Sequence, residues 1–186
     1  GVFVEGAKKN NIPEERAEQI FDLMEKFADY GFNKSHAAAY AILSFQTAYL
    51  KAHYPAAFFA SAMNLELGKS EEIAIFRHEA MCSEVTILPP DVTRSQAKFT
   101  VEMDRDTPCV RYGLAAIRNV GATAVNLLCQ DRDTNGPLTS FQDFVTRGIK
   151  AGMNKRMFEQ LINSGACDAF NHRRSSMFAS LPTAMA

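Results

Sequence analysis

The sequence predicts a mainly α-helical fold that is interrupted once by a short β-hairpin. Apolar residues recur at helical spacing through most of the chain, and prolines and glycines separate these segments. One stretch near the middle instead has the pattern of two short strands around a turn. Of the 186 residues, 47% are hydrophobic, which is enough for a core and argues against a wholly disordered chain.

The first part of the chain is expected to contain four helices. The first covers residues 13–30, with a proline in its first turn and Gly31 at its end. The second begins at an N-cap on Ser35. The third and fourth cover residues 56–67 and 70–85, and a glycine separates them.

The pattern changes after the fourth helix. The stretch "VTILPPDV" must be extended, because two consecutive prolines disfavour a helix there. Two short strands, residues 97–103 and 109–114, are expected on either side of the turn "DRDTP". Three more helices are expected over residues 114–132, 140–148 and 154–165.

These elements divide the chain into three parts. Residues 1–88 form a helical segment, residues 89–112 form an extended linker and the β-hairpin, and residues 113–186 form a second helical module. The first residue is Gly rather than Met, so we expect a fragment or a processed product.

Composition restricts the class of protein. The formal net charge is −1, so any contact with nucleic acid must come from local patches. No two of the four cysteines have the spacing of a zinc knuckle or a CxxC redox pair. We therefore expect them to be reduced thiols. No signal peptide is visible, and the longest stretch of low charge, residues 37–50, is too short to span a membrane. We therefore expect a cytoplasmic protein without a membrane partner.

The stretch "GFNKSHAAAY" places two basic side chains where a helix is expected to begin. Basic groups are electrostatically favoured at the opposite end of a helix. No Asp or Glu occurs between Tyr30 and Leu65, where average composition would place about four. Together with the unpaired N–H groups of a helix start, Lys34, Ser35 and His36 could bind a phosphate. The alternative is that Ser35 only caps the helix and Lys34 is solvated.

The stretch "IRNVGATAV" resembles a helix-hairpin-helix motif, in which a tight turn directs the first N–H groups of a helix at a DNA phosphate. Gly121 occupies the second glycine position of that turn, and Asn119 occupies the first, where Asn tolerates a left-handed backbone. A degenerate partner unit is visible in "MNKRMFEQLINSGACD". An ordinary helical hairpin in a core is the alternative. The candidate DNA-contacting residues are Arg118, Asn119, Gly121, Thr123, Lys155 and Arg156.

Two further pairs of side chains have the chemistry of metal ligands. Asp104 and Asp106 form a D-x-D pattern that could bind Mg²⁺, but Asp is also a common turn residue, and we interpret them as a solvated turn. His78 and Cys82 stand four residues apart on one helix face with no third ligand in view, so we expect a structural role. No metal site or cofactor is therefore expected in this chain.

Five longer stretches cover essentially the whole chain: "KFADYGFNKSHAAAYAILSFQTAYLKAHYPAAFFAS", "ILPPDVTRS", "VRYGLAAIRNVGATAV", "GPLTSFQDF" and "NKRMFEQLINSGACDAF". In their order and spacing they resemble the bacterial replicative DNA polymerase III alpha subunit family, family C. The resemblance implies that residues 1–88 are the C-terminal part of the polymerase fingers, which close over the incoming nucleotide. It also implies that residues 113–186 are a helix-hairpin-helix region that grips duplex DNA.

The resemblance further implies roles for single residues and partners. Lys34 and His36 would contact the triphosphate of a dNTP. The Mg²⁺-binding carboxylates of the family lie in the palm, upstream of this chain, so the chain alone should not polymerise DNA. Implied partners are primer–template DNA, a dNTP and other replicase subunits, including the sliding clamp. The clamp-binding motif is expected beyond the C-terminus, because Met177 and Phe178 lack a leading Gln.

Two other classes of protein stay open. One is a non-catalytic helix-hairpin-helix accessory protein that binds DNA, and the stretch "GFNKSHAAAY" counts against it. The other is an all-helical interaction protein without a nucleic-acid role, and the acid-free window counts against that. DNA binding that weakens with salt would exclude the interaction protein. Binding of a dNTP by the full-length enzyme would exclude the accessory protein.

Overall fold

The computed structural model describes residues 1–28 and 34–185, and it confirms a mainly α-helical fold with one small sheet. The chain divides into two compact units, Gly1–Ala48 and Tyr49–Ala186. No helix in the described ranges is long and apolar enough to cross a membrane.

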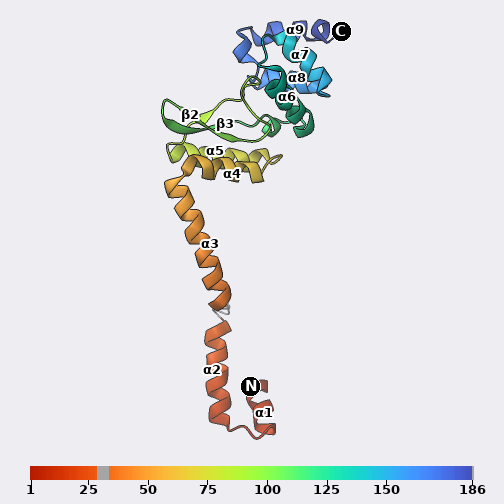
Figure 1. Ribbon diagram of the computed structural model, residues 1–186. Helices are drawn as coiled ribbons and strands as arrows, with labels where there is room; N and C mark the ends of the chain where they lie inside the picture. Colours follow the sequence, from red (N-terminus) through yellow and green to blue (C-terminus); the bar gives the residue numbers. More distant parts are fainter. Residues whose placement is uncertain (29–33, 186) are drawn as a thin grey trace. The chain divides into compact units, whose positions relative to one another are not determined.

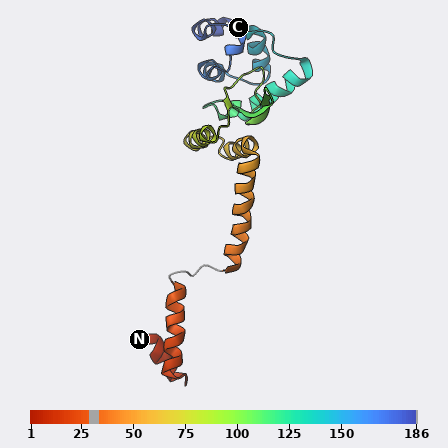
Figure 2. The ribbon, with the colours of Figure 1, turned by 90° about the vertical axis from the view of Figure 1, so that its left-hand side faces the viewer.

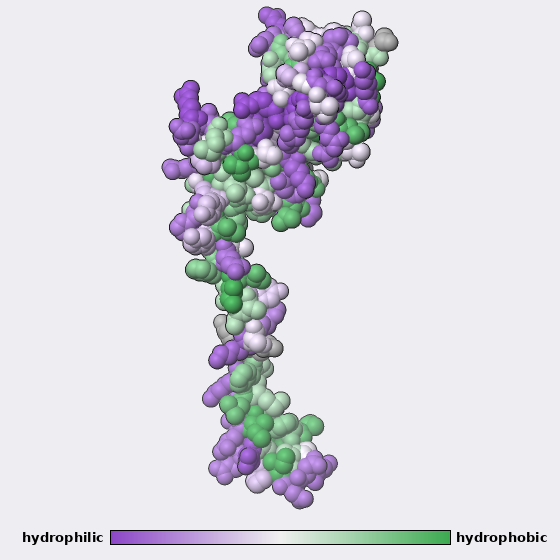
Figure 3. Space-filling view, viewed as in Figure 1, coloured by the Kyte–Doolittle hydropathy of each residue, from purple (hydrophilic) through white to green (hydrophobic). Residues whose placement is uncertain are grey.

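The first unit is built from helices alone. α1 packs on α2 through Phe3 and Phe21, whose ring centroids lie 5.7 Å apart. Ala17 of α2 is buried, whereas Phe27, on the same predicted apolar face, is 68% exposed. Figure 3 shows hydrophobic residues at the surface of this unit. Its helices are α1 (Val2–Lys9), α2 (Glu14–Ala28) and the beginning of α3 (Lys34–His53).

Two features of this unit differ from the sequence prediction. α1 was not predicted, because Val and Gly in "VFVEGAKK" are poor helix formers; charge helps it, with Glu5 in its first turn and Lys8 and Lys9 in its last. α3 begins at Lys34, so Ser35 is its second residue and not its N-cap. The helix end expected at Gly31 lies outside the described residues.

The second unit begins with two helices that pack against a three-stranded sheet (Figures 1 and 2). The strand order is β1-β3-β2; β2 pairs antiparallel with β3, and β1 pairs parallel with β3. Phe59 and Met63 of α4, Ile73 of α5 and Val110 of β3 are all buried in one cluster. The elements are α4 (Pro55–Leu65), α5 (Ser70–Cys82), β1 (Ile87–Leu88), β2 (Thr100–Asp104) and β3 (Thr107–Arg111).

The β-hairpin confirms the predicted strands and turn. Arg105 and Asp106 connect β2 to β3, with φ angles of 47° and 69°. Positive φ at both central residues is typical of the tight turns whose twist matches that of paired strands. The pairing of β1 with β3 was not predicted, since the sequence indicated only that the segment around Ile87 is extended.

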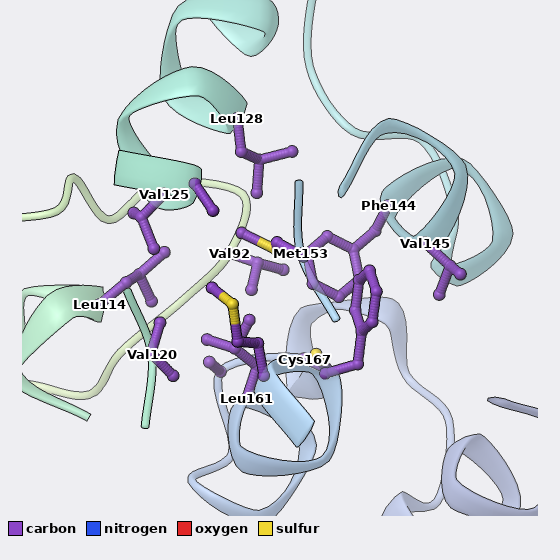
Figure 4. Packing of buried hydrophobic residues seen from close by; sticks show 14 of the residues in the cluster. Val92, Leu114, Val120, Val125, Leu128, Phe144, Val145, Met153, Leu161 and Cys167 are labelled. Atoms are coloured by element: carbon purple, nitrogen blue, oxygen red, sulfur yellow. The ribbon is translucent and has the colours of Figure 1, made fainter. Parts of the chain in front are cut away.

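The remaining elements of the second unit form a helical module around a larger core. Figure 4 shows Leu128 of α6, Phe144 of α7 and Leu161 of α8 entering this core from three helices. The Phe144 and Phe158 rings meet edge to face, with centroids 5.4 Å apart. The elements are the 3₁₀ turn η1 (Leu114–Ala116), α6 (Ala122–Asn135), α7 (Phe141–Lys150), α8 (Lys155–Asn163), the 3₁₀ turn η2 (Asp168–Phe170) and α9 (Arg174–Ala184).

The structure corrects two expectations about this module. The helix expected over residues 114–132 is interrupted between η1 and α6, because Asn119 adopts a φ of 64° that a right-handed helix cannot contain. The last helix, α9, was not predicted. It contains Pro182, and its buried residues are Met177 and Leu181.

The division expected near residue 88 does not coincide with the packing. Phe59 of α4 and Phe99 of the hairpin segment belong to one buried cluster, and the Asn64 side chain bonds both the N–H and the C=O of Phe99 at 2.8 and 2.9 Å. Helices α4 and α5 therefore belong with the sheet. The compact units separate between Ala48 and Tyr49 instead.

Candidate nucleic-acid interface

A tight turn precedes α6, as the sequence predicts. The Val120 N–H donates to the Ile117 carbonyl at 3.1 Å, and Asn119 occupies the third position of this turn with a left-handed backbone. That position of such a turn requires positive φ, which Asn tolerates better than most residues. Val120 is buried and anchors the turn in the core, while Arg118 and Asn119 are exposed.

Gly121 is the N-cap of α6, and the helix start beyond it is open. Its φ of −77° and ψ of 129° are ordinary extended values, so the backbone itself does not demand glycine. No side chain in the described part of the protein caps this helix start. The first-turn N–H groups, including that of Thr123, therefore face solvent with the positive end of the helix dipole.

A second turn connects α7 to α8 and forms a complete helix-hairpin-helix. Gly152, with a φ of 86°, ends α7; its N–H donates to the Ile149 carbonyl at 2.9 Å, and the next N–H, of Met153, reaches the Gly148 carbonyl at 2.9 Å. This pair of bonds is the Schellman ending of a helix. Asn154 then caps α8, because its side-chain oxygen accepts from the Met157 N–H at 3.1 Å.

Sequence reasoning identified the α8 start but missed Gly152 as the residue that makes its turn. The available signal was a glycine two residues after the basic residue Lys150, since basic residues in the last turn and a glycine just beyond it commonly end a helix. The segment treated as a degenerate partner unit is thus the more regular of the two hairpins.

The two helix starts lie close together. A Cβ atom added to Gly121 would lie 3.9 Å from the Met157 Cε, so the first turn of α8 flanks the cap of α6. Val120 and Met157 are buried in the same cluster. The N–H groups at the starts of α6 and α8 are therefore held on neighbouring parts of one rigid core.

The charge around these helix starts is positive. Neither first turn contains an acidic residue, in contrast to α7, which has Asp143 in its first turn. Arg118, Lys155 and Arg156 are exposed. Lys155 lies 3.9 Å from Glu159 one turn later, which is a weak surface pair. No ion pair within the described ranges involves Arg118 or Arg156.

The second predicted site lies in the first turn of α3, within the other unit. Lys34, Ser35 and His36 are all exposed, and the first turn of α3 contains no acidic residue. The His36 ring lies against Tyr40 one turn later, with centroids 4.3 Å apart. The three candidate side chains thus lie on one exposed helical turn.

The remaining residues singled out in the sequence lie in a hairpin turn, on a helix surface or in the core. Asp104 ends β2 and Asp106 lies in the two-residue hairpin turn, both exposed. The Cys82 Sγ lies 3.8 Å from the His78 Nε2 on the surface of α5. Within residues 1–28 and 34–185, no group of three or more His, Cys, Asp or Glu side chains is placed to hold a metal ion. Met177 is buried in the core.

Comparison with known proteins agrees with this geometry. A family model described as a helix-hairpin-helix motif matches residues 84–177, about half of the chain. The chain is 44% identical over 179 residues to a DNA polymerase III subunit alpha of Thermus aquaticus, covering 96% of this chain and 14% of that protein. It is 47% identical over 178 residues to the corresponding protein of Caulobacter vibrioides, covering 96% and 15%. It is 43% identical over 184 residues to the corresponding protein of Neisseria meningitidis serogroup A, covering 99% of this chain and 16% of that protein. The chain thus spans about one seventh of the length of these relatives.

Proposed function

The chain belongs to the helix-hairpin-helix motif family, and we propose that it is part of a bacterial replicative DNA polymerase whose residues 113–186 hold duplex DNA. The observation that carries this proposal is the pair of neighbouring helix starts at α6 and α8, with no acidic residue in either first turn. Such starts bind anions through N–H groups and the helix dipole. The phosphates along the backbone of a DNA duplex are anions that two neighbouring helix starts could bind.

The contacts we propose are made to the DNA backbone and not to the bases. The N–H groups at Gly121 and Thr123 and the side chains of Arg118, Lys155 and Arg156 would each meet a phosphate. Contacts of this kind fix position and carry no sequence information. Their number sets the salt dependence, with a log–log slope of about −0.9 for each phosphate neutralised. Two to four contacts would give weak binding by this module alone.

We propose a second role for the α3 start, on the strength of the family resemblance. Lys34, Ser35 and His36 would contact the triphosphate of the incoming dNTP as part of the polymerase fingers. The chemistry needs two metal ions held by carboxylates, and in this proposal Mg²⁺ is bound by the palm elsewhere in the full enzyme. The chain by itself would then bind but not extend primer–template DNA. Other replicase subunits, including the sliding clamp, would be its partners in the cytoplasm.

A Gly121→Val variant tests the duplex-binding role. Valine suits the extended backbone at this position, and the space beside it is open, so the fold should be retained. Its side chain would keep a phosphate away from the helix start. Since a hydrogen bond to a charged group contributes about 1.5–3 kcal/mol, the affinity should fall by at least about tenfold. Titration of the 186-residue chain with two unrelated duplexes, at several salt concentrations, measures this.

Two features of the result decide the matter. The loss should be equal for both duplexes, and Gln130→Val, on the exposed surface of the same helix, should bind as the unchanged chain does. Binding that does not depend on salt, or a variant that loses affinity for one duplex alone, would rule out the phosphate contacts.

Lys34→Ala in the full-length polymerase tests the proposed contact with the dNTP. Loss of a charge-assisted hydrogen bond of about 1.5–3 kcal/mol should raise the KM for the dNTP. His36→Ala should have a smaller effect, because a histidine is only partly charged near neutral pH. Steady-state kinetics equal to those of the unchanged enzyme for both variants would remove this role and leave only the proposed duplex contacts.

A further inference from the structure

A cleft in the second unit lies next to the turn before α6 and shares only Arg118 with the proposed duplex contacts. Its volume is about 520 Å³. One wall is α5, which contributes Ser70 and Arg77, and another is the extended segment around Pro89. The turn before α6 contributes Ile117 and Arg118. The cleft therefore lies between two separate parts of the fold and falls in the size range of small-molecule sites, about 300–1,000 Å³.

The charge in this cleft is positive. Arg77 and Arg118 both line it, and no Asp or Glu does. Both side chains are exposed, and in the described part of the chain neither takes part in an ion pair or a hydrogen bond. Two guanidinium groups beside one cavity repel each other unless an anion is present between them. Each offers a planar fork of donors that fits a phosphate.

The rest of the lining is mainly apolar, with hydroxyl groups on Ser70, Tyr112 and Ser164. Ile87, Leu88 and Pro89 form an uncharged wall. Tyr112 also lines the cleft; its ring is fixed against Phe99, with centroids 4.8 Å apart at 66°. The Tyr112 hydroxyl makes no hydrogen bond to any described residue. Burial raises the pKa of this hydroxyl, and the nearby charge of Arg77 acts in the opposite direction. The tyrosine is thus a neutral donor in the lining of the cleft.

We propose that this cleft binds one nucleotide, with its phosphate between Arg77 and Arg118 and its base against the apolar wall and Tyr112. An anion alone would need the two arginines but not the wall, and an apolar ligand would need the wall but not the arginines. A nucleotide uses both, because it joins a doubly acidic phosphate to a flat ring that packs on aromatic and apolar surfaces. The inference rests on the proposed function only in preferring a nucleotide to other anions that carry a ring.

The nucleotide has two possible sources with the same chemistry. It could be a free mononucleotide, or it could be one residue of a single strand that continues from the duplex, since Arg118 also borders the proposed duplex surface. Isothermal titration of the 186-residue chain with dAMP, with inorganic phosphate and with a short single-stranded oligonucleotide of dA distinguishes them. An oligonucleotide that binds much more tightly than dAMP indicates the strand, and equal affinities indicate the free nucleotide.

Arg77→Ala is the decisive variant, because Arg77 lies in the cleft and outside the proposed duplex surface. It is an exposed helical residue, so alanine should not disturb the fold. Affinity for dAMP should fall about tenfold, as expected for one lost charge-assisted hydrogen bond. Arg16→Ala, which removes an exposed helical arginine of the other unit, is the matched control and should bind dAMP normally.

The outcomes separate this inference from the proposed function. If the unchanged chain does not bind dAMP, or if Arg77→Ala binds it equally well, the cleft is not a nucleotide site, whatever happens with duplex DNA. If inorganic phosphate binds as tightly as dAMP, the wall contributes nothing and the assignment to a nucleotide fails. Loss of duplex binding in Gly121→Val with unchanged dAMP binding would support both sites, and dAMP binding without any duplex binding would support the cleft alone.

Discussion

The starts of α6 and α8 are neighbours but are completed differently. At α8 the protein supplies its own cap, because the Asn154 side chain accepts the Met157 N–H. At α6 the cap position is Gly121, which has no side chain to offer. A glycine at this position is less stabilising than a capping Asn or Asp by about a few tenths of a kcal/mol. In the proposed interface, α8 would hold the shape of the site, while the open N–H groups of α6 would contact the phosphate.

The largest expected effect is on the free energy of unfolding, from a change in the core on which the starts of both α6 and α8 are packed. Phe158 of α8 is fully buried, and its ring packs so closely on Gly148 that a Cβ atom there would lie 2.7 Å from it. Phe158→Ala should lower the free energy of unfolding by about 3–5 kcal/mol, because it leaves a cavity in the shared core. Urea unfolding measures this. Phe178→Ala, at a partly exposed position of α9, is the control and should cost much less.

Giving α6 the cap that it lacks should separate stability from binding. Gly121→Asp places a capping carboxylate at the helix start, so the protein should become slightly more stable. The same carboxylate would occupy and repel the place of a phosphate, and affinity for duplex DNA should fall by more than about tenfold. Fluorescence anisotropy with a labelled duplex measures the affinity.

Gly121→Asn caps the helix without a charge and is the matched control for this experiment. It should lose less affinity than the Asp variant. If both variants bind DNA as the unchanged chain does, the open start of α6 has no part in binding.

Removing the cap of α8 should show the opposite pattern. Asn154→Ala should lower the free energy of unfolding by about 1 kcal/mol, the usual effect of losing an N-cap. DNA affinity should change little if this side chain serves the protein alone. Asn154→Ser, which retains a capping oxygen, should restore the stability. A large loss of affinity in a stable Asn154→Ala variant would mean that the two starts play equal roles.

The smallest effect is expected from a single charge beside α8. Lys155→Gln should reduce the steepness of the log–log salt dependence by about 0.9, the value for one phosphate contact. Glu159→Gln removes only the partner of Lys155, at 3.9 Å, and should leave that slope unchanged. A slope that is equal in Lys155→Gln and the unchanged chain would show that Lys155 does not meet a phosphate.

Local signals allowed parts of this site to be predicted. The left-handed backbone at Asn119 could be predicted because Asn tolerates that conformation. The hairpin turn at Asp106 could be predicted because Asp is a common turn residue. The strands and most helices follow from spacing and from prolines and glycines. Each of these features is decided within a few residues of the chain.

The features that escaped prediction depend on contacts between distant residues. Phe59 and Val110 share one cluster although about fifty residues separate them, so no local pattern could show that α4 belongs with the sheet. β1 is two residues long, and its pairing with β3 leaves no periodic signal. α9 has an irregular apolar pattern and a proline, and it is held by the burial of Met177 and Leu181 in the core.

The buried side chain of Arg132 has a consequence for how the molecule is made. Its guanidinium donates to the carbonyls of Val92 and Ser95, at 2.9 and 3.1 Å, and so ties α6 to a segment about forty residues earlier. The cluster between α4, α5 and the sheet is complete once residue 116 has been synthesised. At roughly 5–20 residues per second, Arg132 is synthesised about 1–3 s after residue 116, so the carbonyls near Val92 lack their arginine during that interval. The sheet with α4 and α5 can therefore fold first, and the helical module that carries the proposed interface folds against it afterwards.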